Sequence, residues 1–197
     1  MLKNIKIRTR MLLSYAVIIL LGLSASVAAL IMMDRISGNL TVFYENNYAV
    51  TVKAWTAKRE MQYARADILK GILETDDDDM QTALDQASAA LANMRAAFPV
   101  IRERFKGDMA LMDEVDSILV KAVVYRDQVF DLVEAKRNEE AFALMKASYI
   151  PLLNQISDTL DKISGQAERN AKEKVDQGKQ LQRIFMLVGI GIIVLNI

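Results

Sequence analysis

Residues 11–33 read MLLSYAVIILLGLSASVAALIMM, and none of these 23 side chains carries a charge. A helix rises about 1.5 Å per residue, so this run is on the order of 34 Å long, enough to cross the roughly 30 Å apolar core of a bilayer. We therefore expect a membrane-spanning helix here, and the residues on its two sides should lie on opposite sides of a membrane.

The alternative for this run is a cleaved signal peptide, with a basic start in residues 3–10 and a small-residue cleavage site at residues 26–28. Signal peptides have an apolar core of about 7–15 residues. The run continues past that length through Met33, so we favour an anchor. Four basic residues among the first ten favour a cytoplasmic N-terminus. Basic residues between 169 and 183 argue for the opposite orientation, but the first span usually dominates.

A second uncharged run covers residues 184–197. At the same rise it is only about 21 Å long. We expect the chain to stop inside a second span, with the rest of a longer protein beyond it. The expected organisation is a cytoplasmic N-terminus (1–10), a first span (11–33), a periplasmic domain (34–183) and a second span (184–197).

Composition excludes several functions for the segment 34–183. It holds all 25 acidic residues and 21 of the 25 basic ones, which gives a net charge of about −4 and argues against nucleic-acid binding. The chain has no cysteine and no histidine, so it offers neither disulfides nor histidine-dependent catalysis. The run Asp76–Asp79 lacks the spaced ligands and glycine turn of a calcium loop. We expect no enzyme, no metal and no cofactor.

The same segment has a helical composition, with two prolines and abundant alanine and leucine in the chain. We expect an all-α, up-down-up-down four-helix bundle flanked by two transmembrane helices. The expected bundle helices cover residues 34–74, 75–106, 109–137 and 139–183. Thr75 should cap the second helix, Pro99 should kink it or break its last turn, and Asn138 should end the third. A bend is expected near Pro151.

Apolar side chains repeat at three-four spacing, which is typical of a bundle core. The stripe in the first helix is Ile36, Leu40, Phe43, Asn47, Val50, Ala54, Ala57, Met61, Ala64 and Ile68. In the second it is Leu84, Ala87, Leu91, Met94 and Phe98, and in the third Leu111, Val115, Ile118, Ala122, Tyr125, Val129 and Leu132. We also expect Trp55 to fill the bundle, because an indole buries a large area; the alternative is the roof of a pocket.

The opening residues 1–10, followed at once by an apolar span, resemble the start of bacterial methyl-accepting chemotaxis proteins with a four-helix-bundle sensor domain. Residues 44–48, 125–127 and 139–141 resemble the same family. The resemblance covers the whole chain and lies in its layout more than in a strict motif. It implies a periplasmic domain that works as a homodimer. It also implies a HAMP-type linker and a cytoplasmic coiled coil beyond the second span, where an adaptor and a histidine kinase bind.

Arginine can clamp a carboxylate through two parallel hydrogen bonds, so Arg59 and Arg65, beside Tyr63, are candidates for ligand binding. Lys58 is a weaker candidate. Ser148 and Tyr149 should lie at a similar height on the fourth helix, and we expect these groups to meet near the membrane-distal apex. Relatives of the family bind ligands in that half of the bundle.

On the third helix, Tyr125 and Arg126 complete the candidate set. For the arginines the alternative is an ordinary solvated or paired cation, and for Tyr125 it is a place in the core. The expected ligand is an organic acid or amino acid. Alternatives for the whole chain are a sensor that controls a histidine kinase or a cyclic-dinucleotide enzyme, or a ligand-free structural bundle.

Overall fold

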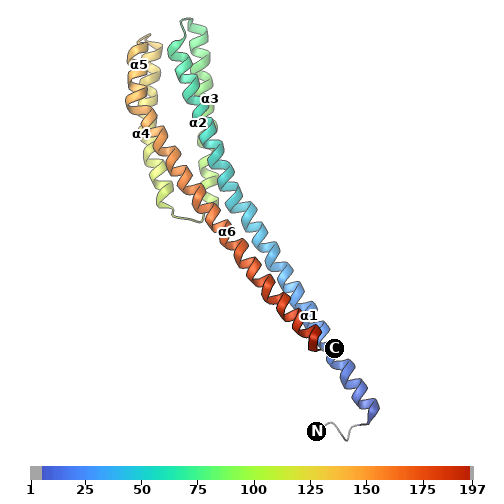
Figure 1. Cartoon of the computed structure of the whole chain (residues 1–197). Helices are drawn as coiled ribbons and strands as arrows, with labels where there is room; N and C mark the ends of the chain where they lie inside the picture. Colours follow the sequence, from blue (N-terminus) through green and yellow to red (C-terminus); the bar gives the residue numbers. More distant parts are fainter. Residues whose placement is uncertain (1–5, 196–197) are drawn as a thin grey trace. The chain divides into compact units, whose positions relative to one another are not determined.

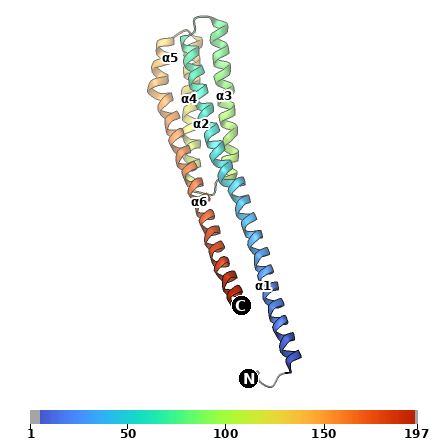
Figure 2. The same ribbon diagram turned by 45° about the vertical axis from the view of Figure 1, so that its right-hand side comes forward.

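The computed structural model describes residues 6–195, and the regular structure in this range is helical (Figures 1 and 2). In chain order the elements are α1 (Ile7–Val42), η1 (Phe43–Tyr48), α2 (Ala49–Leu73), α3 (Asp77–Arg104), α4 (Ala110–Glu134), α5 (Asn138–Leu144), η2 (Met145–Tyr149) and α6 (Ile150–Leu195). Elements η1 and η2 are single π-helical stretches. The chain divides into two compact units, one of residues 43–171 and one formed by the segments on either side.

The unit of residues 43–171 is a four-helix bundle. Its arms are α2, α3, α4, and a fourth arm that runs from α5 through η2 into α6; they lie side by side in both views (Figures 1 and 2). Short connections at residues 74–76, 105–109 and 135–137 join consecutive arms, which makes neighbours antiparallel. The all-α four-helix-bundle expectation is therefore confirmed.

The bundle core follows a repeat of alternating three- and four-residue steps. On α2 the buried side chains are Val50, Ala54, Ala57, Met61, Ala64 and Ile68, and on α6 they are Leu153, Ile156, Leu160, Ile163 and Ala167. This spacing averages 3.5 residues and keeps one seam of each helix turned toward its neighbours. The expected stripes of the second and third helices are buried or half-buried throughout.

The ends of the helices are set by local polar chemistry. The side chain of Asp76, and not Thr75 as expected, caps α3: its Oδ1 accepts hydrogen bonds from the backbone N–H groups of Asp78 and Asp79 at 2.9 and 3.1 Å. Aspartates in this first turn also suit the positive end of the helix dipole. The prediction that Asn138 ends the third helix is wrong. That helix, α4, ends at Glu134, and Lys136 adopts a left-handed conformation with φ of 59°.

The two prolines have different effects. Pro99 lies inside α3, which continues to Arg104. Pro151 follows η2 directly. Because proline lacks an N–H and its ring crowds the carbonyl four residues earlier, the regular ladder cannot pass this point unchanged. The N–H of Ile150 bonds to the carbonyl of Met145, five residues back, so the hydrogen bonding before Pro151 is π-helical, in what we call the π-turn, while the bend expected there stays a prediction.

The other unit contains α1 and the last part of α6. Its apolar run 11–33 is exposed, and among the residues described one helix is long and apolar enough to span a membrane. The expected second span, 184–197, stays a prediction, and its residues 196 and 197 lie outside the described range. Ile36 and Leu40 are exposed and not part of the bundle core, because the bundle begins only at residue 43.

The loop between α3 and α4 is held to α6 by a hydrogen bond, and this contact can be tested by substitution. The backbone N–H of Asp108 donates to Oε1 of Gln166 on α6 at 2.8 Å. A Cβ on Gly107 would overlap this oxygen and the ring of Phe105. We expect Gly107→Ala to lower the free energy of unfolding by about 1–3 kcal/mol, measured by chemical denaturation of the chain in detergent micelles.

The matched control is Gly165→Ala, on α6 beside the same glutamine. Its nearest new neighbour would be Nη1 of Arg169 at 3.5 Å, an ordinary contact. Since alanine favours a helix over glycine by up to about 1 kcal/mol, this variant should be at least as stable as the parent. Equal effects of the two substitutions would contradict the role assigned to the loop contact.

Candidate functional site

The seven side chains expected to bind a ligand come from three elements. Arg59, Tyr63 and Arg65 lie on α2, Tyr125 and Arg126 on α4, and Ser148 and Tyr149 in η2. Within residues 6–195, no hydrogen bond or ion pair joins the α2 members to the others. The structure brings only some of them together: Arg59 and Tyr63 on the outer surface of α2, and Arg126 and Tyr149 around a small cavity.

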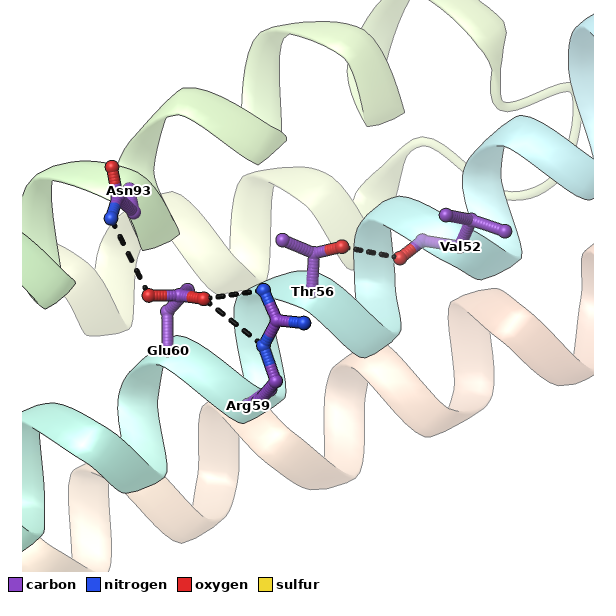
Figure 3. A network of polar contacts seen from close by, with 5 residues as sticks. All are labelled: Val52, Thr56, Arg59, Glu60 and Asn93. Atoms are coloured by element: carbon purple, nitrogen blue, oxygen red, sulfur yellow. Dashed lines mark hydrogen bonds and ion pairs between the residues drawn. The ribbon is translucent and has the colours of Figure 1, made fainter.

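A polar network crosses from α2 to α3 (Figure 3). Nε and Nη2 of Arg59 both donate to Oε1 of Glu60, at 3.1 and 2.7 Å, and Nδ2 of Asn93 reaches Oε2 of Glu60 at 3.5 Å. One turn earlier, the hydroxyl of Thr56 donates to the carbonyl of Val52 at 2.9 Å. Arg59 is exposed, whereas Glu60 is only 7% exposed. The network therefore connects a surface cation to a carboxylate inside the bundle.

This arrangement is governed by the cost of burying a charge. An ionised carboxylate removed from water needs hydrogen-bonding or charged partners, and Arg59 is the cation that Glu60 has. The hydrogen bond to Glu60 in turn raises the pKa of the Arg59 guanidinium above its ordinary value. Any anion that attracts Arg59 away from α2 would leave Glu60 with the amide of Asn93 alone.

An aromatic and cationic stripe, which we call the α2 face, covers the outer side of η1 and α2. Its members are Tyr44, Tyr48, Val52, Trp55, Arg59 and Tyr63. Trp55 is 63% exposed, so the expectation that it fills the bundle is wrong. With Val52 and Arg59 it lines a shallow open groove. Nζ of Lys58 lies 5.4 Å from the Trp55 ring, and Cζ of Arg59 lies 6.0 Å from the Tyr63 ring.

The remaining α2 cations differ in their partners. Lys58 donates to both carboxylate oxygens of Asp161 at 2.6 Å. This ion pair links α2 to α6, so the Lys58 ammonium group already has a partner in the bundle. Arg65 is half-buried and has no ion pair within the described residues. Arg65 lies on a different side of α2 from Arg59. Six residues rotate an α-helix by about 600°, which is about 240° more than one full turn.

The second group surrounds a cavity of about 10 Å³ between α3, α4 and the part of the fourth arm where η2 leads into α6. Its polar lining comes from Arg95, Arg126 and Tyr149; the other lining residues are Leu91, Met94, Leu119, Ala122, Val123 and Leu153. We call this the Tyr149 cavity. It brings together two of the predicted site residues, Arg126 and Tyr149, and adds Arg95, which the sequence did not single out.

Burial determines the chemistry of Tyr149, the last residue of the π-turn. Its pKa is raised to about 12, mainly by desolvation; Arg126 and Arg95 oppose this shift and Asp127 adds to it. The phenol is therefore protonated at physiological pH and able to donate a hydrogen bond. Arg126 is held by its neighbour Asp127, with Nε at 2.7 Å from Oδ1.

Two candidates stand apart from this cavity lining. Tyr125 is half-buried and packs against the core, in agreement with the alternative of a core tyrosine. Ser148 is half-buried beside Tyr149. Glu60 and Asn93 of the network between α2 and α3, and Arg95 of the cavity lining, were not singled out from the sequence. For Arg95 the sequence carries no signal of a cavity position, because it follows the core position Met94 and is exposed like an ordinary surface arginine.

Comparison with known proteins identifies the family of the chain. A family model described as a four helix bundle sensory module for signal transduction matches residues 4–181. The chain belongs to this family, the four-helix-bundle sensory module of methyl-accepting chemotaxis proteins. Neither the curated proteins nor the solved structures yield a match. The resemblance noted from the sequence is thus confirmed, and the module is a chemoreceptor-type sensor for signal transduction.

The burial of Tyr149 in the sensory module makes stability depend on pH in the alkaline range. An unfolded tyrosine ionises near pH 10, whereas Tyr149 ionises near 12 when folded. The unfolded state therefore releases its proton first, and stability falls as pH rises from about 10 to 12, by on the order of 2 kcal/mol. Chemical denaturation at pH 9 and pH 11.5 should record this loss.

Tyr149→Phe should remove this component of the pH dependence. Tyr63→Phe, which deletes an exposed hydroxyl of the sensory module, should keep the parent's loss. If Tyr149→Phe and the parent lose equal stability over this range, the assignment to Tyr149 is wrong.

The Arg59–Glu60 pair of the sensory module can be tested by a double-mutant cycle. Arg59→Ala should destabilise the parent more than it destabilises a Glu60→Gln variant, because only the parent is left with an unpaired buried carboxylate. The control cycle uses Arg137 and Glu140, an exposed pair at 2.6 Å, where screening by water should leave little coupling. Equal coupling in both cycles would contradict the role of burial.

Proposed function

We propose that this sensory module is the periplasmic part of a transmembrane chemoreceptor that binds a small carboxylate, an organic acid or amino acid, as a homodimer. The family assignment supports the receptor class. The basic N-terminus followed by the uncharged run 11–33 supports a membrane anchor with the bundle outside the cytoplasm.

The observation that carries the ligand class is the combination of side chains on the α2 face. Large aromatic side chains that gather exposed on one helix mark an interaction surface. Between them lies Arg59, whose guanidinium is suited to bidentate binding of a carboxylate. Trp55 and Tyr63 supply flat apolar surfaces on either side of this cation. A small acid is the ligand that such a surface would select.

A second copy of the chain is the partner we propose for the α2 face. Tyr44, Tyr48, Val52, Trp55 and Tyr63 succeed one another in steps of three, four or eight residues on one side of the helix, each at least 40% exposed. The groove on this side is open and lined by α2 alone. Two copies packed face to face would cover the aromatic stripe and enclose a ligand between the Arg59 side chains.

The proposed relay follows from competition for Arg59. A ligand carboxylate that engages Arg59 weakens its hold on Glu60, so the arrangement of α2 and α3 that best tolerates a free Glu60 becomes favoured. Shifts of about 1–2 Å at helix interfaces are a normal amplitude for such signals. Helix α6, which is assigned without interruption from Ile150 to Leu195, would carry the change toward a cytoplasmic part that engages an adaptor and a histidine kinase.

A thermal-shift screen of the chain in detergent micelles tests this function, with organic acids, amino acids and aromatic acids as probes. A ligand at 100 times its dissociation constant should add about 2.7 kcal/mol of stability. We expect at least one carboxylate to raise the melting temperature in the parent and not in Arg59→Ala. Binding calorimetry on the folded variant separates lost affinity from lost stability.

The control is Arg137→Ala, which removes an exposed, ion-paired arginine far from α2 in sequence and should bind the ligand as the parent does. Sedimentation of the micelle complex should give the mass of two copies, and Trp55→Asp should lower it to one. The absence of a hit from every class of acid, or a hit that Arg59→Ala leaves unchanged, would refute direct carboxylate sensing at the α2 face.

A further inference from the structure

The part of α6 that precedes the uncharged run 184–197 carries basic residues that the proposed function does not use. Between residues 172 and 183 there are four basic and two acidic side chains, which gives a net charge of +2. They are Lys172, Lys174, Lys179 and Arg183 against Glu173 and Asp176. We place this segment outside the cytoplasm, so the enrichment of basic residues in cytoplasmic loops does not account for them.

Three of these cations share one side of α6, which we call the basic face: Lys172, Lys179 and Arg183. They are seven and four residues apart, and at about 100° per residue these steps place them within about 40° of one another. All three are exposed, and the carboxylate of Asp176 lies on the same side. The half-buried side chains of this segment, Leu181 and Phe185, lie at least about 120° away around the helix. The basic face therefore points outward with an excess of positive charge.

The basic face continues along the same side of the helix into apolar side chains. Met186, Leu187 and Ile190 follow Arg183 by three, four and seven residues, within about 60° of it around the helix. They are 57, 70 and 52% exposed. In a chain anchored as we propose, this apolar side faces the hydrocarbon of the bilayer. The cations then lie where the same side of α6 leaves the hydrocarbon.

The positions of these cations along α6 match the layer of lipid headgroups. That layer adds roughly 5–8 Å to each side of the hydrocarbon core. Arg183 adjoins the first uncharged residue, Lys179 lies about 6 Å further out, and Lys172 about 17 Å from Arg183. Among residues 6–195, none of the three forms an ion pair. Their long side chains are thus available for anionic groups at this level.

We propose that the basic face binds the headgroups of anionic phospholipids in the periplasmic leaflet. Arg183 and Lys179 donate hydrogen bonds to phosphate oxygens, Arg183 through the fork of its guanidinium group. Lys172 lies further out and adds attraction through the surrounding solution. The inference rests on the membrane anchor of the proposed function and adds to it the class of lipid. Bound headgroups would fix the depth at which α6 enters the bilayer.

Photocrosslinking tests which lipid lies beside the basic face. The chain has no cysteine, so Gln180→Cys accepts a benzophenone label at one position, next to Lys179. The labelled chain is placed in nanodiscs of mixed phosphatidylcholine and phosphatidylglycerol and illuminated, and mass spectrometry counts the adducts of each lipid. One basic side chain near an anionic surface favours association by roughly fivefold. We expect phosphatidylglycerol adducts at least about twofold above the proportion in the mixture at low salt, and less enrichment at high salt.

The decisive variant is Lys179→Gln with Arg183→Gln, which should abolish the enrichment. The matched control, Lys146→Gln with Lys162→Gln, removes two exposed lysines of the fourth arm far from the uncharged run and should retain it. Adducts in the proportion of the mixture, or an enrichment that the decisive variant leaves unchanged, would overturn this proposal and leave the membrane anchor intact. A complete lack of lipid adducts would instead refute the anchor on which the proposed function rests.

Discussion

The close contact between α2 and α3 is the constraint on which the rest of the bundle depends. Alanines occupy much of the buried seam on both helices: Ala54, Ala57 and Ala64 on α2 and Ala83, Ala87, Ala90 and Ala97 on α3. Small side chains let helix axes approach closely, and little room then remains for any larger group between them. Polar side chains that lie beside such a seam have few alternative positions, and this holds the carboxylate of Glu60 within reach of Asn93.

The same constraint separates two places on the bundle that differ in their side chains. Large aromatic residues of α2 cannot enter the tight seam, so they gather on the opposite side of the helix with Arg59. A cavity of about 10 Å³ remains where α3 and α4 meet Tyr149 of η2 and Leu153 of α6. The groove on α2 is lined by one helix, whereas the small Tyr149 cavity is lined by side chains from three arms of the bundle.

Much of the bundle was predictable because helix periodicity and end signals are local properties. The expected second and third helices, 75–106 and 109–137, differ from α3 and α4 by at most three residues at each end. The errors occurred where tertiary context decides. Trp55 is a large apolar residue of the kind found in protein cores, but it lies on the outer side of α2. Positions 54 and 57 already occupy the buried side of this helix. Arg59 and Tyr149 lie at comparable heights along their helices, yet height alone does not specify which side of a helix a residue faces. The resemblance to chemotaxis receptors, carried by layout, was confirmed although no site motif accompanied it.

The π-turn has a consequence for chain length. Twelve residues separate Ala141 from Leu153, both buried in the fourth arm. At about 100° per residue these steps would place Leu153 roughly 120° away from the side of Ala141, whereas eleven steps would leave a difference of only about 20°. The π-turn absorbs the additional step and restores the alignment of the two buried stripes. In length, η2 therefore holds one residue more than a regular α-helix would need to join the same two buried stripes.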